Sequence, residues 1–159
     1  MEKPKKIKKI KPIKEVKEKV KKTYIFAVGR RKTAVARVKL IRGKGETLVN
    51  DKKIAEYFPG EISKNAYSRP FQATETLGKY YAIIKVSGSG QNSQLGAVVH
   101  GLSRALDKDD KQSLLLHNKE TFHSLLKKEK LLTRDGRQRE RRKIGQMGRA
   151  RKKKQSPKR

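Results

Sequence analysis

The chain has 159 residues, with 44 Lys and Arg against 15 Asp and Glu, so its formal net charge is +29. Self-repulsion on this scale works against a compact free state, and a polyanion would relieve it, so the candidate partners are nucleic acid, an anionic membrane surface or an acidic protein. The absence of Cys excludes disulfides and thiolate metal sites and fits an intracellular protein. No apolar run approaches the roughly 20 residues that span a bilayer, and the N-terminus has no secretory apolar core.

The charge divides the chain into three parts. Residues 1–22 hold 11 Lys and 3 Glu, and residues 127–159 hold 16 Lys or Arg and 3 acids, so the two ends carry +8 and +13. The middle has an ordinary globular balance. We therefore expect a disordered lysine-rich extension at 1–22, a globular domain at 23–128 and an extended basic tail at 129–159. The apolar spacing within 1–22 is similar to that of a membrane-surface helix, but Pro12 interrupts it and no aromatic anchor is present. Non-specific contact with RNA is therefore favoured for this extension, and no membrane partner is expected.

The first half of the middle part predicts strands. Apolar residues alternate over 24–28 and 34–40, with Gly29–Lys32 as the expected connection, and a third strand is expected after Gly45. Short strands with brief turns favour an antiparallel meander. Residues 51–58 predict a short helix that ends before Pro59.

The second half predicts one more strand and two helices. Pro70 is expected to divide any helix around it. Residues 79–86 are apolar on both faces until Lys85, as in a central strand that is covered on both sides. Apolar residues at helical spacing predict helices at about 93–106 and 111–128. The fold class expected is α+β, a four-stranded sheet with packed helices.

A glycine-rich segment, Gly88–Gly96, joins the last strand to the first long helix. It lacks the glycine at the sixth position of the dinucleotide motif and the Gly-Lys-Ser/Thr of phosphate-binding loops, so nucleotide binding is disfavoured. Two interpretations stay open: a flexible turn with Asn92 or Ser93 as helix cap, or backbone N–H groups of Gly88 and Gly90 that attract an RNA phosphate.

No residue pattern predicts catalysis or a metal site. His100, His117 and His123 lack carboxylates at metal-ligand spacing and are interpreted as surface or satisfied histidines. No nucleophile has a neighbouring base. The sequence predicts no enzyme, no cofactor and no small-molecule substrate.

Two basic segments favour nucleic acid over a merely solvated surface. Arg30, Arg31 and Lys32 are consecutive in the first turn, and alternation places Arg37 and Lys39 on the wet face of the next strand. In the C-terminal arm, half of the 16 cations are Arg, whose guanidinium binds phosphate in a fork and stacks on bases. Arginine-rich segments of this kind order on RNA.

Several motifs resemble one known family, bacterial-type ribosomal protein S-nine of the small subunit. They occur in the same order and spacing between Tyr24 and Arg159: GRRKTAVARV at 29–38, TLGKYYAIIKV at 76–86, HGLSRAL at 100–106 and LLTRDGRQRERRKIG at 131–145. The resemblance implies a compact domain like the second domain of ribosomal protein S-five. It implies a place in the head of the small subunit beside neighbouring head proteins, most simply in a bacterial-type cytoplasmic ribosome.

The resemblance also implies a tail that runs through ribosomal RNA toward the transfer RNA of the peptidyl site, where Lys158 and Arg159 would contact it. Resemblance and charge pattern together predict the rRNA-binding residues Arg30, Arg31, Lys32, Arg37, Lys39, Gly88, Gly90, Arg134, Arg137, Arg139, Arg141, Arg142, Lys143, Arg149 and Arg151. The chain departs from the family at Ser156-Pro157, where Phe-Ser is usual. An alternative from charge alone is a nucleoid-type DNA-binding protein.

Overall fold

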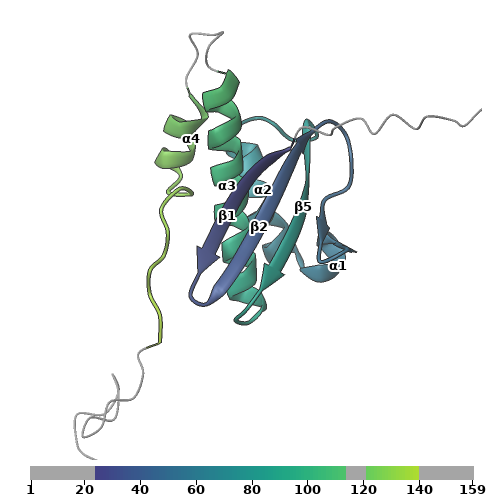
Figure 1. The fold of residues 1–159 in the computed structure, drawn as a ribbon, viewed down its shortest axis with the longest axis vertical. Helices are drawn as coiled ribbons and strands as arrows, with labels where there is room; N and C mark the ends of the chain where they lie inside the picture. The colour runs from purple at the N-terminus through teal and green to yellow at the C-terminus, as the bar shows by residue number, and fades with distance from the viewer. Residues whose placement is uncertain (1–23, 114–120, 140–159) are drawn as a thin grey trace, which may run out of the picture.

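The computed structural model describes residues 24–113 and 121–139. It contains one β-sheet with its long helix packed on one face, an α+β arrangement that confirms the predicted fold class (Figure 1). The sheet has five strands in the order β1-β2-β5-β3-β4, one more than the four expected. The additional strand, β4 (Lys52–Lys53), has two exposed residues, which is too short to produce a period-two pattern.

Strands β1 (Ile25–Arg31) and β2 (Ala34–Arg42) form an antiparallel hairpin, and β5 (Tyr80–Ser87) pairs antiparallel with β2. The alternation in the sequence predicted all three. The expected connection at Gly29–Lys32 is wrong, because pairing continues to Arg31 opposite Ala34. Only Lys32 and Thr33 form the turn, and the positive φ of Lys32 (49°) suits a two-residue hairpin.

The expected antiparallel meander is wrong beyond this hairpin. Strand β3 (Leu48–Val49) pairs parallel with β5. A parallel pair requires a crossover, and β4 with two helices, α1 (Ile54–Tyr57) and α2 (Glu61–Ala73), provides it between β3 and β5. The Asn50 side chain continues this contact, because its Nδ2 donates to Val86 O (3.0 Å) and its Oδ1 accepts from Val86 N (2.9 Å).

Helix α2 contradicts the expectation that Pro70 divides it. The helix runs without interruption from Glu61 to Ala73, with Pro70 inside. Proline removes one helical hydrogen bond. Here its ring is fully buried, so the burial of apolar surface offsets that loss.

Helix α3 (Gln91–Ser113) provides most of the core against the sheet. It confirms the helical stripe but is longer than the expected 93–106, because polar residues continue it beyond the apolar stripe. The buried residues of the stripe are Ala97, Val98, Leu102, Ala105 and Leu106.

Two glycines allow α3 to lie unusually close to β1. A Cβ on Gly29 would lie 1.9 Å from Ala97 O, and a Cβ on Gly101 would lie 2.7 Å from Val38 Cγ2. No real Cβ makes contacts this short, so a side chain at either position would force the two elements apart. Because Gly29 lies on β1 and Val38 on β2, the two glycines set how closely the β1–β2 hairpin packs against the helix.

The predicted second helix at 111–128 is only partly present. Residues 111–113 belong to α3, residues 114–120 lie outside the described part, and α4 (Phe122–Lys128) forms the remainder. The N–H of Phe122 donates to Asp110 Oδ2 (2.8 Å). This contact attaches the start of α4 to α3.

Side chains of α3 occupy the free edge of β1. Arg104 Nη1 donates to Val28 O (2.6 Å) and Lys108 Nζ donates to Phe26 O (3.0 Å). The N–H of Arg30 donates to His100 Nδ1 (3.3 Å). An edge strand offers unpaired backbone groups to other chains, and these contacts satisfy them within the domain.

A buried carboxylate joins the far end of β2 to α3. Asp109 has a side chain only 3% exposed. It accepts hydrogen bonds from Arg42 Nη2 (2.7 Å) and Nε (3.0 Å) and from Tyr80 Oη (2.5 Å). Burial, and then the hydrogen bond to Asp109, raise the pKa of Tyr80 to about 12. The phenol therefore remains a donor at neutral pH.

The expectation that β5 is covered on both faces is wrong. Ala82, Ile84 and Val86 are buried, whereas Ile83 is 37% exposed and Lys85 is exposed. Figure 1 shows why: β1, β2 and β5 lie in front of α2 and α3. In the part of the chain that the structure describes, all helices that pack on this part of the sheet lie on one side of it.

Candidate nucleic-acid interface

The hairpin turn presents the three consecutive cations predicted from the sequence. Arg30 and Lys32 are exposed and Arg31 is half-buried. Arg31 lies across α3 at Gly96, where a Cβ would come within 2.4 Å of its Cδ. Glycine at position 96 thus leaves room for the guanidinium against the helix. The turn and the helix together fix where this charge lies.

Arg37 and Lys39 continue the positive charge along β2. Both are exposed, and their strand neighbours Ala36, Val38 and Leu40 are buried. The period-two interpretation of this strand is therefore confirmed. Because the two cations share the sheet face opposite α3, the core is undisturbed by them.

The segment after α4 returns to the hairpin. Leu131 is buried in the core and Leu132 packs against it. Further along, Asp135 Oδ2 lies 3.8 Å from Arg31 Nη2, and Gln138 Nε2 donates to Lys32 O (3.2 Å). The first residues of the basic arm thus follow the hairpin.

Asp135 organises the arginines of this segment. Arg137 donates to it from Nη2 (2.8 Å), from Nε (3.0 Å) and from its own backbone N–H (3.1 Å). These hydrogen bonds, reinforced by the charges of Arg137 and Arg31, hold the pKa of the Asp135 carboxyl well below its usual range. Asp135 therefore links two of the predicted RNA-binding arginines, Arg31 and Arg137, as an ionised carboxylate at neutral pH.

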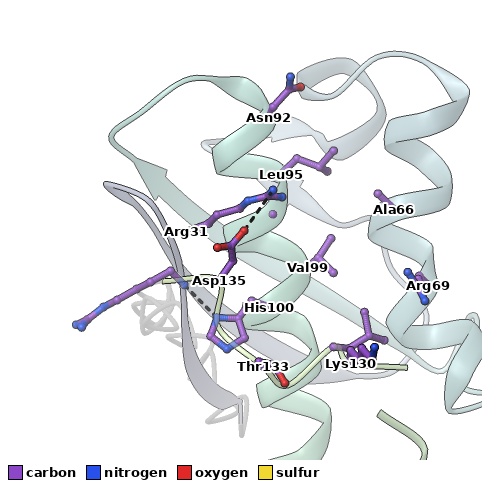
Figure 2. Close-up of a pocket in the computed structure, with 13 residues that line it drawn as sticks. Arg31, Ala66, Arg69, Asn92, Leu95, Val99, His100, Lys130, Thr133 and Asp135 are labelled. Atoms are coloured by element: carbon purple, nitrogen blue, oxygen red, sulfur yellow. Dashed lines mark hydrogen bonds and ion pairs between the residues drawn. The ribbon is translucent and has the colours of Figure 1, made fainter. Parts of the chain in front are cut away.

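A cavity of about 310 Å³ opens between the hairpin, α2, α3 and this segment (Figure 2). Four cations line it, namely Arg30, Arg31, Arg69 and Lys130. Arg69 is already paired, since its Nη2 lies 2.6 Å from Glu129 Oε2. Arg69 and Lys130 were not predicted. No sequence signal indicated them, because they are brought to the hairpin only by the packing of α2 and the return of the chain.

His100 lies in the same cavity and its side chain is half-buried. Burial, and then the charge of Arg104, lower the pKa of His100 from 6.5. The neutral ring accepts the Arg30 N–H at Nδ1 (3.3 Å), and Figure 2 shows the position of His100 in the cavity. His100 is thus a satisfied histidine, as the sequence suggested, and it also positions Arg30.

The glycine-rich loop lies directly against the hairpin turn. Gly88 has a φ of +82°, and a Cβ there would lie 2.5 Å from Thr33 O. Glycine is therefore required by backbone contact. The predicted cap is wrong: α3 begins at Gln91, so Asn92 and Ser93 lie inside its first turn, and Gly90 O accepts the N–H of Ser93 (2.9 Å).

The remaining predicted residues fall into two groups. Arg134 and Arg139 are exposed on the segment that follows the hairpin. The others lie outside the described residues: Arg141, Arg142, Lys143, Arg149, Arg151, Lys158 and Arg159.

The described ranges 24–113 and 121–139 contain neither a candidate metal site nor a candidate membrane-spanning helix. No three His, Cys, Asp or Glu side chains gather there at metal-binding distance. His123 Nδ1 instead pairs with Asp107 Oδ1 (2.8 Å). Within the same ranges, no helix combines the length and the apolar composition needed to cross a bilayer.

Comparison with known proteins identifies similar chains. Residues 29–159 match the family model of ribosomal protein S9/S16. The small ribosomal subunit protein uS9 of Dehalococcoides mccartyi strain BAV1 is 45% identical over 139 residues, 87% of this chain and 98% of that protein. The uS9 protein of Rickettsia conorii is 46% identical over 134 residues, 84% of this chain and 78% of that protein.

Proposed function

Because the chain belongs to the ribosomal protein S9/S16 family, we propose that it binds ribosomal RNA through its hairpin and C-terminal segment. The protein is a structural component of the small ribosomal subunit and not an enzyme. We call this proposed contact area the basic surface. Its described residues are Arg30, Arg31, Lys32, Arg37, Lys39, Gly88, Gly90, Arg134, Arg137 and Arg139.

One observation carries the proposal: the C-terminal segment lies beside the hairpin. The Gln138–Lys32 and Asp135–Arg31 contacts bring arginines that are distant in sequence to the three cations of the turn. When clustered guanidinium and ammonium groups neutralise the phosphates of a nucleic acid, the counterions of those phosphates are released. This release stabilises the complex, and the affinity falls as the salt concentration rises. The backbone N–H groups near Gly88 and Gly90 add donors for the same phosphates.

Beyond the basic surface, we propose that the C-terminal arm continues along ribosomal RNA through Arg141, Arg142, Lys143, Arg149 and Arg151. Lys158 and Arg159 would contact the transfer RNA in the peptidyl site. Anchoring of the arm at residues 131–138 supports this role, because a tethered segment binds its groove at a raised effective concentration. Neighbouring head proteins in a bacterial-type cytoplasmic ribosome are the proposed protein partners.

Reconstitution of the small subunit tests the hairpin. Arg30→Ala with Arg31→Ala should lower the occupancy of the protein in salt-washed subunits, because two phosphate contacts are lost. The matched control removes two exposed cations elsewhere, Lys64→Ala with Lys127→Ala, and should retain full occupancy. Equal occupancy of both double variants would contradict the proposal.

Truncation tests the end of the arm. Subunits whose protein lacks Lys158 and Arg159 should assemble normally but retain peptidyl-site transfer RNA less well. Unchanged retention would remove the transfer RNA contact from the proposal. Competition between duplex DNA and folded ribosomal RNA at equal salt separates this function from nucleoid-type binding, and a preference for DNA would favour the latter.

A further inference from the structure

The face of the sheet opposite α3 carries both apolar and cationic side chains. Pairing in the sheet defines one row across the strands, Phe26–Lys39–Ile83–Leu48, and a second row, Val28–Arg37–Lys85. The ring of Tyr24 lies next to the first row, with Lys39 Nζ 5.0 Å from its centroid. We call these eight residues the open face.

The open face exposes three large hydrophobic side chains. Phe26 is 45% exposed, Tyr24 is 49% exposed and Ile83 is 37% exposed. They account for three of the five large hydrophobic side chains exposed among the described residues, the other two being Ile62 and Leu77. Their concentration on one sheet face, within reach of one another across neighbouring strands, indicates a binding surface.

The charge of the open face selects the kind of partner. None of its residues is acidic, and Arg37, Lys39 and Lys85 are all exposed. A second copy of the chain, or its own lysine-rich first 22 residues, would place positive charge against positive charge. An anionic partner with flat apolar groups complements both the cations and the rings, and unpaired RNA has both properties.

We propose that the open face binds an unpaired stretch of RNA, with bases stacked on Phe26 and Tyr24 and phosphates at the three cations. This inference rests on the proposed binding of ribosomal RNA and specifies the form of RNA at this surface. A duplex presents its phosphates outward and keeps its bases stacked on each other, so it would use the cations and leave the rings unoccupied. The open face places the rings of Tyr24 and Phe26 beside the cations of β2 and β5, and this combination favours the unpaired form.

Binding of short RNAs to the full chain tests the proposal. The probes are a short unpaired RNA with one 2-aminopurine base, whose fluorescence reports stacking, and a duplex of the same length. Measurement at raised salt weakens the contribution of the basic arms. Phe26→Ala should lower the affinity for the unpaired RNA about tenfold and leave the duplex affinity unchanged, since one stacked base is lost.

Three further variants interpret the result. Phe26→Tyr keeps an aromatic face and should retain the wild-type affinity and fluorescence change, which separates stacking from a folding defect. Phe26→Leu keeps apolar volume without the ring and should lose affinity for the unpaired RNA. Ile62→Ala removes an exposed hydrophobic residue on α2, 87% exposed, and should change nothing.

Several outcomes would overturn the proposal. Equal losses for duplex and unpaired RNA, or no loss in Phe26→Ala, would exclude base stacking on this face. Variants that bind unpaired RNA normally but assemble into subunits lacking a neighbouring protein would assign the face to that protein instead. If the wild-type chain binds neither ribosomal RNA nor the probe, the proposed function itself fails, which is a distinguishable result.

Discussion

Replacement of Asp109 with Asn should destabilise the free protein by about 2–3 kcal/mol. The carboxylate is 3% exposed and accepts from Arg42 through Nη2 and Nε and from the Tyr80 hydroxyl. Asn keeps one acceptor oxygen but places an NH₂ group among donors, so at least one charge-assisted hydrogen bond of about 1.5–3 kcal/mol is lost. Removal of one partner from a fully buried ion pair costs about 3–5 kcal/mol. Because the Arg42 side chain is 61% exposed, water can hydrate it in the variant. The expected loss is therefore about 2–3 kcal/mol, below the range for a fully buried ion pair.

Urea unfolding followed by circular dichroism measures this loss in the free energy of unfolding. In thermal unfolding followed by the same signal, Tm should fall by roughly 8–12 °C. The matched control is Glu46→Gln, because the Lys53–Glu46 pair has side chains 65% and 66% exposed. Exposed pairs contribute little, so the control should change stability by less than about 0.5 kcal/mol. A double-mutant cycle with Tyr80→Phe should show a coupling of at least about 0.5 kcal/mol. If Asp109→Asn stays within 0.5 kcal/mol of the wild type, a structural role for the buried carboxylate is refuted.

Three other outcomes are expected. Gly101→Ala should destabilise the protein by at least about 2 kcal/mol in the same urea assay, since its Cβ would lie 2.7 Å from Val38 Cγ2; unchanged stability would mean that the helix can move away from the sheet. The folded-state pKa of Tyr80 is raised to about 12 from 10.0, so stability should fall as pH rises between these values. Tyr80→Phe should remove that part of the fall, and an identical pH profile in the variant would argue against it. The pKa of His100 is lowered from 6.5, so its imidazole NMR signals should titrate with a midpoint below 6.5, and stability should decrease as pH falls from 6.5 through that midpoint. A midpoint above 6.5 would contradict the burial argument.

Local patterns in the sequence were sufficient for the elements of the hairpin and of α3. Alternation identified β1, β2 and β5, and helical spacing identified the stripe that ends at Leu106. These patterns record which side chains face the core. They contain no information on strand neighbours, so the parallel pairing of β3 with β5 and the short strand β4 could not be predicted.

The errors in the prediction have a common physical origin, since tertiary packing outweighed local preference. Burial of the Pro70 ring retained a continuous helix. β5 was expected to be covered on both faces because Ile83 is apolar, yet that side chain is exposed. The apolar character of a residue does not by itself show whether its side chain is buried in the core or exposed on the surface.

The candidate site could also be predicted only in part from the sequence. Charge runs identified Arg30, Arg31 and Arg37 as well as the basic arm. The proximity of Arg69 and Lys130 to the hairpin depends on a chain reversal after α4, which no periodicity encodes. Neither of the two interpretations of the glycine-rich segment included the backbone contact with Thr33 that requires glycine at position 88.

The attachment of residues 131–138 to the hairpin limits how far Lys158 and Arg159 can lie from the domain. Leu131 and Gln138 are held on the domain, so Arg139 leaves it from a fixed place. The 20 residues that follow cover at most about 70 Å, whatever conformation they adopt. Any contact that Lys158 or Arg159 makes must therefore lie within that distance of Arg139, because the domain holds the start of the connecting segment in place.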